Sequence, residues 1–168
     1  AITKFDFRGK PWRPTQSHAL FAPYNLQLEQ ELWEGRLEAA RLFGTANQLV
    51  RIPVNPPEAS LGIAAAGKTF LDLRESLLRL GFSDADLARF GVRLLDVGML
   101  YPLDAVTVRQ FAAGLEEILV IEEKRSFLEL LLRDALFNQR ERPRIVGKRD
   151  EMEDLLVPGY GELDADAI

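Results

Sequence analysis

The chain has 168 residues, of which 47% are hydrophobic and 28% charged, and this is the profile of an ordinary globular protein. It has no cysteine and one histidine, His18, which excludes a disulfide framework, a thiolate-ligated zinc or iron–sulfur site, and a multi-histidine metal site within these residues. A formal net charge of -5 argues against a dedicated nucleic-acid binder, so nucleic acid is not expected among the partners.

The sequence contains no segment that indicates a membrane or export. No apolar run approaches the ~20 residues that a transmembrane helix needs, and residues 1–6 lack the apolar core of a secretory signal. We therefore expect a cytoplasmic protein with no membrane partner.

The first part of the chain, residues 1–25, is expected to be an irregular leader. It combines several prolines with aromatic side chains that follow no period, which is typical of a segment that lies on another surface. Its aromatic residues are Phe5, Phe7, Trp12, Phe21 and Tyr24.

A helix and a linker are expected to follow the leader. Over residues 26–43, Trp33, Leu37 and Ala40 share one helical face, and Gly44 is a plausible end. The proline-rich residues 53–60 predict a rigid linker. Residues 1–60 are thus expected to pack on the following domain or on its neighbours.

Residues 61–150 predict a domain in which short apolar strands alternate with helices. Strands are expected at 61–66, 92–97, 118–121 and 144–146. Helices are expected at 68–80, from a capping box at Ser83 to Phe90, after a cap at Asp104, and from a capping box at Ser126 to about Asn138. This alternation predicts an α/β fold with an open, mainly parallel sheet of four to five strands and helices on both faces. The acidic residues 151–168 predict a tail.

Residues 62–69 match the G-x-x-x-x-G-K-[ST] pattern of phosphate-binding P-loops. In that interpretation main-chain amides hold the phosphates and Lys68 contacts the terminal ones, so a small nucleotide-binding protein is the alternative function. However, a P-loop strand precedes the first glycine, whereas the strand candidate here, residues 63–66, lies where the loop should be. The competing prediction is a buried strand, a turn at Gly67, and a helix whose first turn holds Lys68 and Thr69.

Polar or glycine-bearing turns follow all four predicted strands. Because the carboxyl ends of parallel strands meet at one edge, where such folds place their sites, these turns form the candidate functional surface. The residues singled out are Gly67, Lys68 and Thr69 after the first strand, Glu122, Glu123, Lys124 and Arg125 after the third, and Lys148 and Arg149 after the fourth. They predict an anion site or a contact with a neighbouring domain. The domain contact is favoured, because Glu122 and Glu123 would repel a free polyphosphate. No catalytic or metal-binding residue is predicted.

Four blocks of the sequence resemble the indolepyruvate ferredoxin oxidoreductases and occur in that family's order. They are residues 61–74, Gly91-Val-Arg-Leu-Leu-Asp-Val-Gly-Met-Leu-Tyr-Pro-Leu103, residues 111–125 and residues 142–150, and Gly161-Glu-Leu-Asp164 also fits. The combination is specific and covers most of residues 26–168. It weakens the P-loop alternative, because the family has this Gly-Lys stretch without being P-loop ATPases.

The resemblance implies a fragment of a large thiamine-diphosphate-dependent enzyme that decarboxylates arylpyruvates oxidatively to acyl-CoA and passes the electrons to ferredoxin. The matching part is the domain similar to the transketolase C-terminal domain, with the linker that leads into it. The parent enzyme is expected to use thiamine diphosphate with Mg, iron–sulfur clusters and CoA, and to be oligomeric. The fragment itself is expected to bind none of these cofactors, although a phosphate of CoA is one candidate for the anion site.

The leading hypothesis is therefore a non-catalytic structural and assembly domain that contacts neighbouring domains of the same enzyme. The alternatives are the nucleotide-binding protein that uses residues 62–69 and an isolated regulatory binding module.

Overall fold

The computed structural model describes residues 8–10 and 13–168, so Phe5, Phe7 and Trp12 of the predicted leader lie outside the described residues. In chain order the elements are α1 (Tyr24–Glu31), the π-helical segment η1 (Leu32–Arg36), α2 (Leu37–Ala46), β1 (Val50–Val54), β2 (Leu61–Ala66), α3 (Gly67–Arg79), α4 (Asp84–Arg89), β3 (Val92–Val97), α5 (Ala105–Ala112), β4 (Glu117–Ile121), α6 (Leu128–Leu136) and β5 (Arg144–Val146).

One five-stranded sheet has the order β1-β3-β2-β4-β5. Strands β2 to β5 are mutually parallel and lie where the sequence predicts strands, so the mainly parallel α/β sheet is confirmed. Strand β1, which pairs antiparallel with β3, was not predicted. Pro53 and Val54, expected in the linker, belong to this strand. Proline cannot donate to a ladder, and it is tolerated here because β1 lies at the edge of the sheet.

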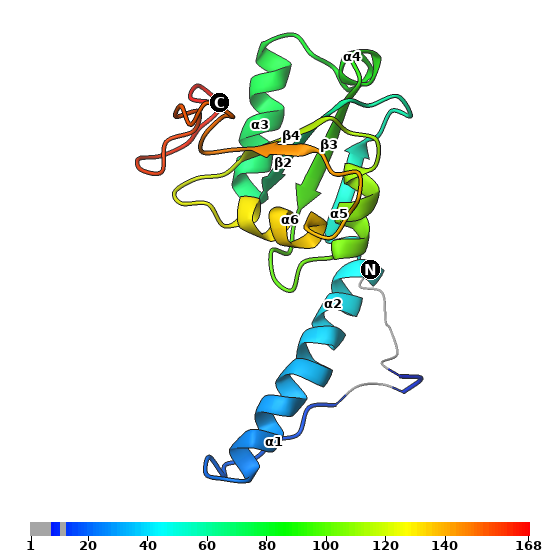
Figure 1. Cartoon of the computed structure of the whole chain (residues 1–168), viewed down its shortest axis with the longest axis vertical. Coiled ribbons are helices and arrows are strands. Elements are labelled where there is room, and N and C mark those ends of the chain that lie inside the picture. The colour runs from blue at the N-terminus through cyan, green and yellow to red at the C-terminus, as the bar shows by residue number, and fades with distance from the viewer. Residues whose placement is uncertain (1–7, 11–12) are drawn as a thin grey trace.

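Helices cover both faces of this sheet (Figure 1), as expected. Helices α5 and α6 pack on one face, in a cluster whose large side chains include Leu95, Phe111, Ile118 and Leu132. Helices α3 and α4 pack on the other face, in a cluster that includes Phe70, Leu73, Leu87 and Leu94. Successive side chains of a strand point to opposite faces, which is why the neighbours Leu94 and Leu95 serve different clusters.

The N-terminal arm, residues 13–46, extends away from the α/β domain (Figure 1). Its helix runs without a break from α1 through η1 into α2, so the predicted end at Gly44 is wrong. The buried positions of this helix are the small residues Gly35, Ala39 and Gly44, whereas of the predicted face Leu37 and Ala40 are half-buried and Trp33 is exposed. Trp33 is 62% exposed.

The leader runs back along this helix and is fixed to it by polar contacts. The N–H of Thr15 donates to Glu31 at 2.8 Å, and the carbonyl of Thr15 accepts from Arg36 at the same distance. Arg8 donates to the carbonyl of Glu34 at 3.4 Å. In the described part of the arm these hydrogen bonds hold the two segments together.

Candidate functional site at the carboxyl edge of the sheet

The candidate site is the carboxyl edge, where the turns after β2, β3, β4 and β5 meet. The chain passes from β2 to β3 on one side and then crosses back to β4 on the other side of β2. The direction of winding therefore reverses between β2 and β4, and open α/β sheets bind ligands in the crevice outside such a switch point. A hollow of about 390 Å³ lies there.

This switch-point hollow brings together five of the nine predicted site residues. Its lining consists of Ala66, Thr69, Leu100, Glu122, Glu123, Lys124, Arg125, Phe127 and Leu128. Gly67, Lys68, Lys148 and Arg149 lie in neighbouring turns and do not line it. The sequence analysis missed Leu100 and Phe127, because it searched these turns for polar and glycine residues. The hollow therefore combines a charged rim with apolar walls.

Glu122 is held by the start of α6. Its carboxylate accepts the N–H groups of Phe127 at 2.9 Å, Leu128 at 2.7 Å and Glu129 at 3.1 Å. The predicted capping box at Ser126 is wrong: its hydroxyl contacts the Glu129 carboxylate at 3.2 Å, and the helix start has no side-chain cap of that kind. First-turn amides lack partners within a helix and attract negative charge, so Glu122 satisfies them from the preceding strand end. Its charge is thereby compensated within the fold.

Lys68 and Lys124 each pair with a carboxylate close to them in the sequence, Lys68 with Asp72 in α3 and Lys124 with the preceding Glu123. Lys68 Nζ lies 2.7 Å from Asp72 Oδ2, and Lys124 Nζ lies 3.0 Å from Glu123 Oε1. The hydrogen bond with Asp72 raises the pKa of Lys68, and the hydrogen bond from Lys124 lowers the pKa of Glu123. Both shifts favour the charged forms of Lys68 and Glu123. The edge is a mixed surface rather than a uniformly cationic one.

Lys148 and Arg149 face the C-terminal residues. Lys148 Nζ donates to the carbonyls of Glu122 and of Pro158, the latter at 3.1 Å. Burial lowers the pKa of Lys148, and nearby Glu122 opposes this shift. Arg149 donates to the carbonyl of Glu153 at 2.5 Å.

Arg125 differs from these cations. It is exposed at the rim of the hollow, and within residues 8–10 and 13–168 its side chain has no hydrogen bond or ion pair. The preceding Lys124 has a φ of 61°, in the left-handed region that non-glycine residues seldom adopt and that often marks functional turns. This turn therefore presents one unpaired cation to whatever approaches the hollow.

The geometry contradicts the P-loop alternative. Residues 62–66, which would form the phosphate loop, are paired on both sides within the sheet, with β3 and with β4. Gly62 also lies so close to Phe111 that an added Cβ would be 2.6 Å from its ring. Their main-chain amides are therefore not free to surround a phosphate. The competing prediction is confirmed: a buried strand, a turn at Gly67, and a helix with Lys68 and Thr69 in its first turn.

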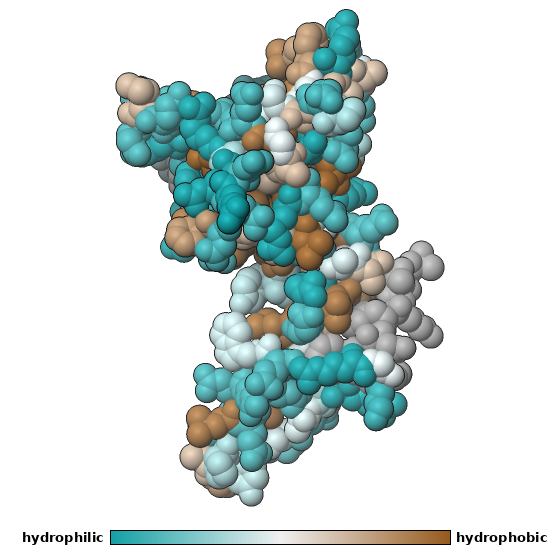
Figure 2. All heavy atoms as spheres, turned by 45° about the vertical axis from the view of Figure 1, so that its right-hand side comes forward, coloured by the Kyte–Doolittle hydropathy of each residue, from teal (hydrophilic) through white to brown (hydrophobic). Residues whose placement is uncertain are grey.

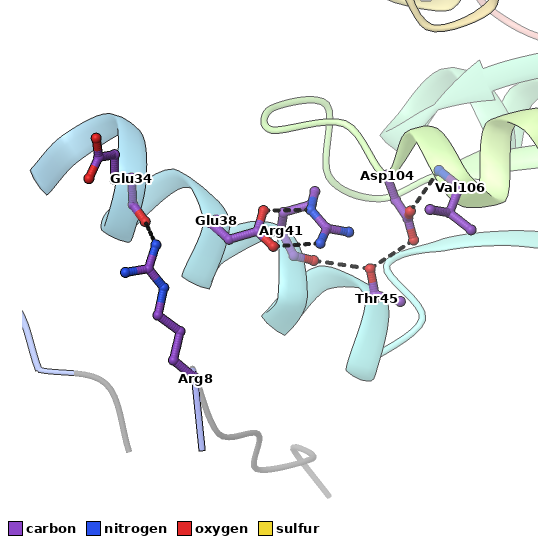
Figure 3. Close-up of polar contacts among 7 residues, drawn as sticks. All are labelled: Arg8, Glu34, Glu38, Arg41, Thr45, Asp104 and Val106. Atoms are coloured by element: carbon purple, nitrogen blue, oxygen red, sulfur yellow. Dashed lines mark hydrogen bonds and ion pairs between the residues drawn. The ribbon is translucent and has the colours of Figure 1, made fainter. Parts of the chain in front are cut away.

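The loop after β3 joins the arm to the carboxyl edge (Figure 3). Asp104 is buried and caps α5 as predicted, accepting from the amides of Val106 at 3.1 Å and Thr107 at 3.4 Å. The same carboxylate accepts from the Thr45 hydroxyl at the end of α2, at 2.9 Å. Burial raises the pKa of Asp104, but the hydrogen bonds from Thr45 and Thr107 outweigh it, so that its pKa lies below its ordinary value.

The side chains present limit which cofactors this part of the chain can bind. The chain has no thiolate for an iron–sulfur cluster, and within the described part no three histidine or acidic side chains are grouped as a metal site would require. The described residues do not fit an iron–sulfur cluster or a metal-bound diphosphate. The helices in the described residues are all too short or too polar to cross a membrane.

Comparison with known proteins identifies relatives. The family described as "Indolepyruvate oxidoreductase domain" matches residues 51–168. The chain is 33% identical over 102 residues to the indolepyruvate oxidoreductase subunit IorA of Methanothermobacter marburgensis, an alignment that covers 61% of the chain and 15% of that protein. The chain thus spans about 15% of the length of the curated relative it matches.

Two solved structures resemble the fold. One is the 2-oxoglutarate:ferredoxin oxidoreductase of Magnetococcus marinus, solved with 2-oxoglutarate, coenzyme A and succinyl-CoA bound. It is 20% identical with a TM-score of 0.46, over 76% of this chain and 20% of that chain. The other, a split-gene transketolase described as an inactive beta4 tetramer, is 19% identical with a TM-score of 0.42, over 58% of this chain and 32% of that chain.

Proposed function

The chain belongs to the family of indolepyruvate oxidoreductase domains, and from this we propose that it is a non-catalytic structural and assembly domain of a larger enzyme. That enzyme is a thiamine-diphosphate-dependent indolepyruvate ferredoxin oxidoreductase, which converts arylpyruvates and related 2-oxoacids to acyl-CoA. In this proposal Mg²⁺, iron–sulfur clusters, CoA and ferredoxin are bound by other parts of an oligomeric, cytoplasmic parent. This chain contacts its neighbouring domains.

The observation that carries this proposal is the apolar surface of the arm. Helix α1 contains no buried residue, and Figure 2 shows apolar residues in brown among the polar ones of the arm. The large exposed apolar residues are Leu20, Phe21, Tyr24, Leu26, Leu32 and Trp33. Helices in proteins owe most of their stability to packing of an apolar face, and clustered exposed apolar residues mark interaction sites. The arm therefore has the surface of a segment that packs on a neighbouring domain.

The carboxyl edge supports a domain contact over a free phosphate. Lys68 and Lys124 are already paired with carboxylates, so the edge offers little net charge to a free polyphosphate. Arg125 beside the apolar wall of Phe127 suits an acidic loop that also brings an apolar side chain. Residues 13–46 and the turns at the carboxyl edge would then face neighbours, while in this structure residues 157–168 lie against the domain.

The arm is tested by Leu26→Ser with Trp33→Ser in the complete enzyme. Both side chains are exposed here, so the isolated chain should unfold at unchanged denaturant concentration, whereas the complete enzyme should lose assembly by size-exclusion chromatography and lose turnover. Gln27→Ser, an exposed polar change between them, is the matched control. Intact assembly and turnover in the double variant would contradict the role of the arm.

The edge is tested by Arg125→Glu in the complete enzyme. Reversing an unpaired cation at an interface should reduce turnover about tenfold, the effect of about 1.4 kcal/mol. Arg140→Glu is the matched control, because Arg140 is an exposed arginine that does not line the hollow. If the two variants have equal turnover and equal CoA affinity, this edge contacts neither a domain nor CoA.

A further inference from the structure

The C-terminal clasp, residues 157–168, crosses the carboxyl edge in the order of the strands. Lys148, after β5, donates to the carbonyl of Pro158. Lys124, after β4, donates to the carbonyl of Gly161. Lys68, after β2, donates to the carbonyl of Leu163 at 3.3 Å. Three lysines from three different places at this edge thus hold main-chain carbonyls of one C-terminal segment.

The clasp continues onto α3 and inserts one apolar anchor. Ser76 donates to the carbonyl of Ala165, and Arg79 pairs with Asp166. The Leu163 side chain is 3% exposed and packs in the same cluster as Phe70 and Leu73. Figure 1 shows this red segment beside α3. The segment therefore combines hydrogen bonds to its main-chain carbonyls with apolar side chains that pack on the domain, Leu163 as the buried anchor and Val157 and Ile168 partly buried.

The chemistry of these contacts suits a peptide better than an anion. Lys68 and Lys124 already have charged partners in Asp72 and Glu123, and all three lysines donate to neutral carbonyls. Glu123 is also held by a main-chain hydrogen bond from Leu163, which contributes to its lowered pKa after that from Lys124. The edge therefore offers both donors and an acceptor to a main chain that lies across it.

We propose that the carboxyl edge is a peptide-binding surface whose ligand is the chain's own residues 157–168, bound in cis and released as a unit while the sheet stays folded. Release frees Lys124 at the rim of the switch-point hollow, together with Lys68 and Lys148. The clasp is a property of this chain alone and does not depend on the proposed assembly role. It would hold even if the Leu26→Ser/Trp33→Ser and Arg125→Glu variants behaved like their controls in the complete enzyme.

The test uses the full chain, in which an introduced cysteine is unique because the sequence has none. Tyr160→Cys, at a position 77% exposed, carries a nitroxide whose mobility reports the clasp. Leu130→Cys, on the exposed side of α6, carries the reference label. The probe is a synthetic peptide of residues 157–168, added up to about 10 mM because a tethered segment has a millimolar effective concentration.

We expect the peptide to raise the mobile fraction at position 160 and to leave position 130 unchanged. A peptide with Leu163→Ala should require a concentration at least about tenfold higher for the same effect, because it lacks the buried anchor. Placing Leu163→Ala in the chain instead should lower the required concentration of the natural peptide by a similar factor. Arg149→Met in the chain is the control, because Arg149 contacts Glu153 outside the clasp.

Three outcomes would overturn the proposal. An immobile label at position 160 in both the natural chain and the Leu163→Ala chain would make the segment a fixed part of the domain. If the natural and Leu163→Ala peptides mobilised the label at position 160 equally well, the Leu163 side chain would not contribute to binding of the segment. Mobilisation of both labels together would mean that the clasp opens only when the domain unfolds.

Discussion

In the α/β domain Phe111 of α5 is fully buried against the sheet, whereas in the arm Trp33 of the π-helical segment η1 is 62% exposed. Both regions contain helices rich in apolar residues. The domain places its apolar stripes against a sheet, and the arm places only Gly35, Ala39 and Gly44 on its inner side. In this chain a helix can therefore form without burying its large apolar side chains in a core. The arm is helical, but several of its large apolar side chains are exposed.

Truncating one aromatic residue in each region tests whether the domain and the arm differ in this way, and it has the largest expected effect. Phe111→Ala should lower the free energy of unfolding by about 3–5 kcal/mol, because it leaves a cavity in the core. Trp33→Ala in the isolated chain should change it by no more than about 0.5 kcal/mol, as for surface changes. Urea unfolding followed by circular dichroism measures both. A large loss in Trp33→Ala would show that the arm does pack within this chain.

The next largest effect is expected at Asp104, which ties the two regions together. Asp104→Ala should destabilise the chain by about 2–3 kcal/mol, because it removes both the cap of α5 and the acceptor of the Thr45 and Thr107 hydroxyls. Thr45→Ala, which removes only the tie from α2, should cost less, about 1 kcal/mol. Equal losses would place the whole effect in the tie to the arm. Denaturant titration of the two variants separates these contributions.

The same residue predicts a pH dependence. The pKa of Asp104 lies below its ordinary value of 3.8 in the folded chain, so its contribution to stability is complete above that value. It is lost as the pH falls through the folded pKa. The stability difference between the natural chain and Asp104→Asn should therefore shrink below about pH 4. A difference that is constant from neutral pH to pH 3 would contradict the ionised cap.

Two glycines at the junction should behave differently from each other. Gly98 approaches the carbonyl of Leu49 so closely that an added Cβ would lie 2.7 Å from that oxygen. Gly98→Ala should therefore cost about 2 kcal/mol, because main chain must shift. At Gly44 the Cβ would meet the flexible end of Met99, and alanine favours the helix. Gly44→Ala should be neutral or slightly stabilising by thermal unfolding; an equal loss in both variants would contradict this difference in rigidity.

The smallest expected effect is binding of Mg-ATP to the domain, which should be absent in calorimetry. Residues 62–66 are paired within the sheet, so their amides are not available to phosphates. Lys68→Ala should leave the titration unchanged. A micromolar affinity that disappears in this variant would restore the nucleotide-binding alternative, because a phosphate-contacting lysine contributes most of such binding.

Local patterns in the sequence predicted much of the domain. The strand 61–66 is a short apolar run and the strand 92–97 is mostly apolar, and their bounds agree with β2 and β3. The caps at Ser83 and Asp104 were also predicted, because a side chain and the amides it accepts lie within three residues of each other. The placement of the turns at the carboxyl edge followed from the parallel topology. These features depend on spacing along the chain, which the sequence displays directly.

Tertiary structure decided the contacts between residues distant in sequence. Strand β1 contains a proline and forms only because β3 offers an edge, with Arg51 bound to Asp96 at 2.7 Å. Glu122 replaced Ser126 as the cap of α6, because the end of β4 places its carboxylate in front of the helix. The clasp joins Lys68 to Leu163 across 95 positions. Spacing cannot predict such pairs, because each depends on where the sheet has already placed both partners.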